Sequence, residues 1–408
     1  MTVLIAGGGI AGLTLALMLH EAGIRARVFE KARSSRELGV GINLLPHAVA
    51  QLDRLGLLSR LDQIGVRTRQ LIYKTARGQD ILMQPRGLWA GLAHPQYSIH
   101  RGKLHLMLLE CARNRLGPEN VLINRALLGF EQDAGSVSAQ FVSHEGEHFR
   151  ERGEALIGAD GIHSEVRGHF FPNQGQPRWN GVTMWRGATW APQFKGGDTM
   201  LVAGGMSRKL VIYPIAHDPA RPGEALINWV VNVKVAEAGT PPPERNDWSR
   251  RATVQDVLAH TENQLVVPEL DIGDLVRKTE AIFEYPMCDR DGLPRWSHGR
   301  VTLIGDAAHP MYPVGSNGAS QAILDARCLS DHLAHASDVA AALSAYDEAR
   351  RPITTEIVRM NRAGGPERVI DLVQARAPQG FRDVHDLATE EELQAIVGPY
   401  QKISASRS

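Results

Sequence analysis

Three glycines near the start of the chain have the spacing of a phosphate-binding turn. GGGIAG places Gly7, Gly9 and Gly12 in a G-x-G-x-x-G pattern between the apolar run TVLIA and the helix-like run LTLALMLHEAG. The first glycine permits a tight turn, the second lets backbone approach a pyrophosphate, and the third lets helix and strand pack closely. The pattern predicts a dinucleotide-binding turn, and by itself it does not separate FAD from NAD.

An acid in the right place strengthens this interpretation. The run RARVFEK (25–31) predicts a second strand, and Glu30 at its end could accept hydrogen bonds from an adenosine ribose. The remaining alternative is a glycine-rich turn that packs only against protein.

Two aspartates repeat the strand–turn–helix arrangement much later in the chain. Asp160 follows the apolar run EALIGA and precedes a helix that we expect to begin near Ser164. Asp306 directly follows VTLIG, and the helix-like run ASQAILDARCLSDHLAHA comes after it. An Asp-Gly pair alone is also an ordinary turn or helix cap. Three such turns together predict one extended ligand that crosses a shared sheet edge.

The composition narrows the classes of protein to which this chain can belong. A length of 408 residues predicts two domains. The 45 acidic side chains balance the 45 Lys and Arg, and this neutral net charge gives no electrostatic reason to expect binding to nucleic acid. Cys111, Cys288 and Cys328 are far apart, so we expect no metal ion, and their spacing fits a cytoplasmic protein. The apolar N-terminus lacks a basic leader and reaches Glu21 soon after Gly12, so we expect no membrane anchor.

The motifs together resemble a known family. GGGIAGL, FEK, YSIHRGKLHLML, GADGIHSEVR and GDAAHPMYPVGSNGASQAILD look like the FAD-contacting segments of the single-component flavoprotein aromatic hydroxylases, which include p-hydroxybenzoate and salicylate hydroxylase. The resemblance covers residues 2–355. It implies that Glu30 binds the adenosine ribose, Arg101 the pyrophosphate and Asp306 the ribityl chain, and that Asp160 lies in a segment shared by FAD and NAD(P)H.

A narrower likeness concerns the substrate. LGVGINLLPHAV, PQYSIHRGKL, GVTMWRG, INWVV and YPMCDRDGLPRW resemble the phenazine-modifying branch, typified by 5-methylphenazine-1-carboxylate monooxygenase. That enzyme performs a decarboxylative hydroxylation. The resemblance therefore implies an aromatic or N-heteroaromatic acid as substrate, with loss of its carboxylate as one outcome.

The resemblance implies a mixed α/β fold with a Rossmann-like FAD-binding domain, an interleaved β-sheet substrate domain and a helical C-terminus. We assign residues 1–70, 98–170 and 290–365 to the FAD-binding domain and residues 71–97 and 171–289 to the substrate domain. Residues 366–408 form the helical tail, which we expect to cap the core or contact a second subunit.

The chemistry of such an enzyme is demanding. FAD takes a hydride from NAD(P)H, reacts with O2, and forms a C4a-hydroperoxide that must be kept from water until the ring attacks it. A second G-x-G-x-x-G is not visible, so NAD(P)H binds transiently over the same domain. We expect FAD to contact Gly7, Gly9, Ile10, Ala11, Gly12, Glu30, Lys31, Val40, Arg101, Asp160, Asp306, Gly315, Asn317 and Gly318.

The residues between 171 and 289 are rich in β-type runs with alternating apolar and aromatic residues, which predicts a sheet that covers the flavin. Its aromatic residues are candidates for a planar substrate, although each is also an ordinary core residue. Arg186 could meet a carboxylate or form a structural ion pair, and Tyr213 could hydrogen-bond a phenol or ring nitrogen. We expect the substrate to contact Trp185, Arg186, Tyr213, Trp229, Tyr285 and Val314.

Three residues are candidates for a catalytic role: His47, Tyr213 and Pro313. His47 could be a general base or simply a residue in the first helical turn of HAVAQLDRLGLL. Pro313, with the small residues that follow it, leaves space for oxygen and substrate beside the flavin. His309 fits a positioning role better than that of a catalytic acid.

The sequence therefore predicts an FAD-dependent aromatic monooxygenase that acts as a monomer or homodimer. An epoxidase or reductase on the same scaffold is an alternative, although the C-terminal EELQAIVGPYQKISASRS is too polar for the membrane-facing end expected of such enzymes. A flavin-binding regulator without turnover is the non-enzymatic alternative.

Overall fold

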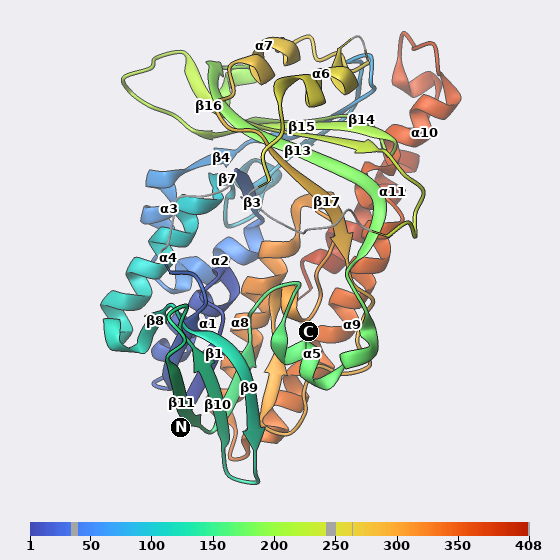
Figure 1. The fold of residues 1–408 in the computed structure, drawn as a ribbon. Coiled ribbons are helices and arrows are strands. Elements are labelled where there is room, and N and C mark those ends of the chain that lie inside the picture. Colours follow the sequence, from blue (N-terminus) through green and yellow to red (C-terminus); the bar gives the residue numbers. More distant parts are fainter. Residues whose placement is uncertain (34–39, 242–249, 263, 407–408) are drawn as a thin grey trace.

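The chain has the mixed α/β architecture that the sequence predicts. The computed structural model describes residues 1–33, 40–241, 250–262 and 264–406, so Leu38 and Gly39 of the LGVGINLLPHAV motif lie outside the described residues. A parallel sheet with helices forms the lower part of the molecule in Figure 1, and a larger, mostly antiparallel sheet forms the upper part.

The parallel sheet has five strands in the order β18-β12-β1-β2-β8. The strands are β1 (Thr2–Ala6), β2 (Arg25–Glu30), β8 (Val121–Ile123), β12 (Ala155–Gly158) and β18 (Val301–Leu303). All neighbouring pairs are parallel. Because parallel strands end at one edge of a sheet, the turns after β1, β12 and β18 lie in a row, as an extended ligand would require.

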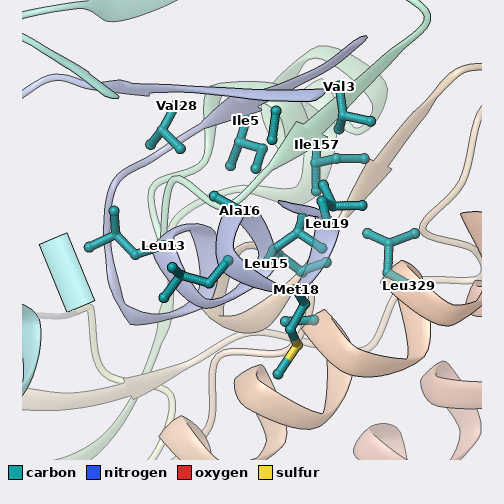
Figure 2. Close-up of a cluster of buried hydrophobic side chains, with 14 of the residues drawn as sticks. Val3, Ile5, Leu13, Leu15, Ala16, Met18, Leu19, Val28, Ile157 and Leu329 are labelled. Carbon is teal, nitrogen blue, oxygen red and sulfur yellow. The ribbon is translucent and has the colours of Figure 1, made fainter. Parts of the chain in front are cut away.

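Helix α1 (Ile10–Glu21) explains the unusual apolarity of the N-terminus. Its residues from Gly12 to Leu19 are all buried, because the helix lies between the sheet and helix α8 (Gly318–His335). Figure 2 shows Leu15 and Met18 of α1 among side chains of β1, β2, β12 and α8. Helix α4 (Arg101–Leu116) also packs against α1. Among the described residues, no helix combines the length and apolar character needed to cross a bilayer.

The larger sheet has seven strands in the order β17-β13-β16-β15-β14-β5-β6. The strands are β5 (Gln70–Lys74), β6 (Asp80–Pro85), β13 (Arg178–Pro192), β14 (Thr199–Gly205), β15 (Arg208–Ala216), β16 (Glu224–Lys234) and β17 (Phe283–Asp289). Helices α6 (Val254–Thr261) and α7 (Ile272–Arg277) cover its outer face at the top of Figure 1.

Smaller elements join these two layers. Strands β3 (Gly41–Leu44), β4 (Gly65–Thr68) and β7 (Gln96–His100) form a three-stranded sheet, and β9 (Ala126–Gln132), β10 (Val137–Val142) and β11 (His148–Gly153) form another. Helices α2 (Pro46–Arg54) and α3 (Leu58–Ile64) follow β3, and α5 (Glu165–Phe170) follows β12.

The C-terminal region is helical, as predicted. Helix α9 (Val339–Arg362) packs on α8, whereas α10 (Arg368–Arg376) and α11 (Glu390–Ser404) lie along the seven-stranded sheet (Figure 1). Their apolar side chains share a buried cluster with residues of β5 and β14. The tail is therefore an integral part of the core.

The complete burial of α1 makes a stability prediction. Leu15 is 0% exposed, so we expect Leu15→Ala to lower the free energy of unfolding by about 2–5 kcal/mol through lost contacts and a cavity. Leu128 on β9 is 51% exposed, and Leu128→Ala is the matched control with a change within about 0.5 kcal/mol. Urea unfolding of both variants measures the difference. Equal losses would contradict the packing described for α1.

Candidate active site

A cavity of about 340 Å³ lies where the carboxyl edge of the parallel sheet meets the inner face of the seven-stranded sheet. The turns that follow β1, β12 and β18 contribute one side of it, and β13, β15 and β16 contribute the other. Segments far apart in the sequence thus meet in one space, within the volume range of ligand pockets in proteins.

The first turn is shaped by three glycines with different tasks. Gly7 has a φ of +113°, and a Cβ there would lie 2.2 Å from the Ala159 carbonyl oxygen. A Cβ on Gly12 would lie 2.0 Å from the Gly7 carbonyl oxygen, so Gly12 is needed for helix α1 to start here. A Cβ on Gly9 would meet nothing within 4 Å, and Gly9, Ile10 and Ala11 line the cavity. The open side of the turn is therefore the side that faces the cavity.

Glu30 holds the turn from the next strand. One carboxylate oxygen accepts the Gly8 N–H at 2.7 Å, and the other accepts the Ala32 N–H at 2.8 Å. A carboxylate has further lone pairs, so Glu30 can still accept a ribose hydroxyl. Lys31, which we also expected near the cofactor, is exposed.

Asp306 and Arg101 both line the cavity, and their opposite charges interact. They are open to the cavity yet surrounded by protein. Separation from bulk water raises the pKa of Asp306, and the charges of His309 and Arg101 oppose that shift. The same separation lowers the pKa of Arg101, and Asp306 opposes it. The Arg101 backbone N–H donates to the Val40 carbonyl at 3.0 Å, which places Val40 beside this pair.

Asp160 caps the helix that follows it. Its Oδ2 accepts the Glu165 N–H at 2.8 Å, while Ser164 caps the same helix through the Arg167 N–H. Asp160 Oδ1 is buried and has no hydrogen-bond partner among the described residues, and burial raises the pKa of this carboxyl. Its neighbours Ala159 and Gly161 line the cavity.

The segment from Pro313 to Asn317, which we call the 313–317 loop, closes the cavity before α8. Pro313, Asn317 and Gly318 line the cavity. Gly315 has a φ of +66°, and Ser316 also has a positive φ of +55°. Left-handed backbone is uncommon for a serine, so this loop is strained at the cavity wall.

His309 supports the turn that carries Asp306. Its Nε2 lies 2.5 Å from Asp325 Oδ2, which also accepts the Gly305 N–H at 3.0 Å. His309 is 4% exposed and does not line the cavity. This contact agrees with a positioning role.

The seven-stranded sheet presents a regular array of side chains to the cavity. Residues two apart on a strand share a face, and the register places Arg186, Val230 and Val211 side by side across β13, β16 and β15. Arg186 Nη2 donates to the Gly41 carbonyl at 2.7 Å, and its buried Nε has no hydrogen-bond partner among the described residues. The sheet residues that line the cavity are Met184, Arg186, Lys209, Val211, Tyr213, Val230 and Asn232.

Two predicted substrate residues lie on the other face of this sheet. Trp185 is 5% exposed and Trp229 is 0% exposed, and both belong to the cluster beneath α6 and α7. The Trp229 indole N–H donates to the Thr279 hydroxyl at 2.9 Å. Trp185 and Arg186 are neighbours in a strand, so they cannot both face the cavity. This placement favours the alternative interpretation of the two tryptophans as ordinary core residues.

Three other predicted residues lie beside the cavity without lining it. Tyr285 and Val314 are buried in a cluster with Met184 and Val230, two residues that line the cavity. His47 lies in the first turn of α2 and is half-buried. This placement matches the structural interpretation of His47, and its role as a base stays a prediction.

Sequence reasoning missed several residues of the sheet face. Lys209, Asn232 and Val230 line the cavity, and Asn232 Oδ1 is buried without a partner among the described residues. These residues could have been found by counting in steps of two along each strand from Arg186 and Tyr213, because such residues share a face. Choosing candidates by aromatic type instead selected residues from both faces of the sheet.

These observations match what FAD requires. The cavity has bare backbone at Gly9, an unpartnered Nε on Arg186, and the interacting charges of Arg101 and Asp306, and the unpartnered Asp160 Oδ1 lies between two residues that line it. A family model described as an FAD binding domain matches residues 1–361. Together with the aromatic hydroxylases to which its sequence is 32–45% identical, this match shows the family. The chain belongs to the FAD-dependent aromatic hydroxylases.

Relatives with similar sequences agree with this assignment. The hydroxylase is 45% identical to the phenazine 1,6-dicarboxylic acid hydroxylase of Lysobacter antibioticus, over 88% of this chain and 89% of that protein. It is 32% identical to 3-hydroxybenzoate 6-hydroxylase 1 of Aquipseudomonas alcaligenes, over 88% and 87% of the two chains. Residues after 361, including α10 and α11, lie beyond the matched family model.

Solved structures share the fold at low identity. A salicylate hydroxylase substrate complex superposes with a TM-score of 0.75 at 22% identity, covering 100% of this hydroxylase and 98% of that chain. Klebsiella pneumoniae HpxO, complexed with FAD and uric acid, superposes with a TM-score of 0.73 at 21% identity, covering 100% and 93%. These structures confirm the predicted fold, and the sequence relatives confirm the predicted family.

The first turn offers a test of cofactor binding that separates it from folding. Gly9→Ala should leave the stability of the apoprotein unchanged, because its Cβ meets only open cavity, yet weaken FAD binding about tenfold or more. Gly12→Ala is the contrasting variant, since its Cβ clashes with the Gly7 carbonyl and should lower apoprotein stability as well. FAD titration by fluorescence quenching and thermal unfolding measure the two effects. Normal FAD affinity in Gly9→Ala would contradict the placement of the cofactor.

Proposed function

We propose that this hydroxylase uses NAD(P)H and O2 to hydroxylate an aromatic or N-heteroaromatic acid, whose carboxylate binds Arg186. The observation that carries the proposal is the charge of the cavity wall. The lining residues include three cations, Arg101, Arg186 and Lys209, and one acid, Asp306.

Two of these cations already have counter-charges. Lys209 forms an ion pair with Glu367, and Arg101 lies within the influence of Asp306. Arg186 donates to the uncharged Gly41 carbonyl and forms no ion pair in the described part of the chain, and its Nε–H remains available. A buried or half-buried cation without a counter-ion favours an anionic ligand, and a guanidinium matches a carboxylate. This supports an acid as the substrate class.

Tyr213 stands next to this cation and gives the substrate a second polar contact. Burial raises the pKa of Tyr213, with Arg186 acting in the opposite direction, so its hydroxyl stays protonated at neutral pH. The hydroxyl can then hydrogen-bond a phenol or ring nitrogen of the substrate. Met184, Val211 and Val230 supply the apolar surface against which a planar ring can lie.

The chain holds, orients and shields the reactants. When bound, FAD supplies the electron transfer and the activation of oxygen. Asp306 and Arg101 line the cavity where they can hold the ribityl and pyrophosphate chain of FAD, and Gly9 leaves room for the pyrophosphate. Pro313 and the 313–317 loop would cover the ring, while the apolar sheet residues keep water from it. The relative that acts on a phenazine dicarboxylic acid supports a tricyclic N-heteroaromatic acid within this class.

A substrate screen tests the proposed reaction. Purified protein with FAD should oxidise NADH or NADPH faster when a phenazine-, hydroxynicotinate- or salicylate-type acid is present. Mass spectrometry of the product should show the gain of one oxygen atom, with or without loss of CO2. The matching carboxamides are the control, because they keep the ring and lack the charge. No stimulation by any acid, or hydrogen peroxide as the sole product, would contradict the proposal.

The role of Arg186 makes a sharper prediction. Arg186→Met should raise the KM for the acid about 10- to 100-fold, since it removes a hydrogen bond to a charged group. The FAD dissociation constant should stay within about twofold of the original protein. Arg221→Met is the matched control, because Arg221 is half exposed at the surface, where it pairs with Glu224 and lies over the Trp190 ring, and it does not line the cavity. An equal loss for acid and carboxamide would show that Arg186 does not recognise the carboxylate.

A further inference from the structure

The 313–317 loop is held in its strained conformation from behind, by the C-terminal region. Gly315 and Ser316 are both left-handed, with φ values of +66° and +55°, and the serine has no intrinsic preference for this state. Such a conformation persists only where the surroundings impose it. Contacts from the C-terminal region impose the left-handed conformation on this loop.

Tyr400 of α11 makes the closest of these contacts. Its hydroxyl donates to the Val314 carbonyl at 2.9 Å, and a Cβ on Gly315 would lie 2.5 Å from its ring. The ring therefore lies directly on the backbone of Gly315. Tyr400 is 3% exposed, and burial raises its pKa, so the hydroxyl remains a donor throughout the physiological pH range.

Glu367 and Asn361 add two further contacts from the same region. Glu367 accepts the Gly315 N–H at 3.5 Å through one oxygen and pairs with Lys209 through the other. Asn361 Nδ2 donates to the Tyr312 carbonyl at 3.0 Å. Both side chains are buried, with Glu367 6% exposed and Asn361 0% exposed. Lys209 lines the main cavity, so this buried pair links the cavity wall to the loop.

The loop needs this support because there is space on both of its sides. The main cavity lies in front of it, and a second cavity of about 50 Å³ lies behind it, lined by Gly315, Ser316, Glu367 and Tyr400. A thin segment between two cavities can relax backwards when a contact is lost. Backward relaxation would carry the backbone of Gly315 and Ser316 away from a bound flavin.

We propose that α11 and the segment around Glu367 are part of the flavin-binding machinery, with Tyr400 as the positioning residue that holds Gly315 and Ser316 against the flavin ring. Tyr400 lies behind the loop and acts through the Val314 carbonyl and the Gly315 backbone. The C-terminal region thus determines the shape of a wall to which it contributes no lining residue.

Tyr400→Phe tests the proposal without changing the packing volume. The variant should bind FAD about fivefold more weakly, which corresponds to about 1 kcal/mol, the net worth of one hydrogen bond. The visible absorption bands of the bound flavin should shift, because the polar backbone next to the ring moves. Tyr400→Leu, which also removes the ring from Gly315, should give a larger change in both measurements.

Tyr346→Phe is the matched control. Tyr346 is 0% exposed, and its hydroxyl donates to the Leu303 carbonyl at 3.0 Å, so the substitution removes an equivalent buried hydrogen bond away from the loop. We expect a similar loss of thermal stability from both Tyr→Phe variants, with the flavin spectrum altered in Tyr400→Phe alone. An FAD affinity and spectrum of Tyr400→Phe identical to those of Tyr346→Phe would overturn the proposal. These measurements need no substrate, so they are independent of the proposed reaction.

Discussion

The ends of the parallel strands lie at one edge of the sheet, and the rest of the molecule depends on this constraint. The order β18-β12-β1-β2 brings Asp306, Asp160, Gly7 and Glu30 into a row, although they lie far apart in the sequence. Neighbouring strands are about 4.8 Å apart, so the row spans about 14 Å, the scale of a dinucleotide and not of a small ion. The row exists only while α1 packs close beneath it, which Gly12 permits.

The second sheet separates core from cavity by the alternation of its strands. The outer face carries Trp185 and Trp229 into a buried cluster under α6 and α7, and the inner face carries Arg186 and Tyr213 into the cavity. The two tryptophans thus stabilise the sheet, while the residues of the other face line the cavity. Arg186 combines exposure to the cavity with the absence of an ion-pair partner among the described residues, and the proposed acidic substrate rests on this combination.

Strain at the cavity wall is balanced by contacts made elsewhere. Gly315 and Ser316 adopt left-handed backbone conformations beside the cavity. Tyr400 and Glu367 of the C-terminal region contact and hydrogen-bond the backbone of this loop. The Lys209–Glu367 pair is nearly buried on both sides, with exposed side-chain fractions of 6% and 7%. Such a pair tolerates the loss of neither partner, because the remaining charge would be left in a dry environment. The C-terminal helices therefore serve the site as well as the core.

The sequence by itself determined the local chemistry of this protein. The glycine spacing at Gly7, Gly9 and Gly12, the acid at Glu30 and the turn at Asp306 all depend on short-range backbone rules, which a sequence expresses directly. The same rules predicted β1, α1, β2 and α8 close to their observed bounds. Tertiary structure alone decided which face of each strand meets the cavity. Alternation in the sequence divides a strand's side chains into two sets, but only packing against neighbouring elements decides which set faces the cavity. It also decided that Tyr400 lies against Gly315, a contact between residues 85 positions apart that no local pattern encodes.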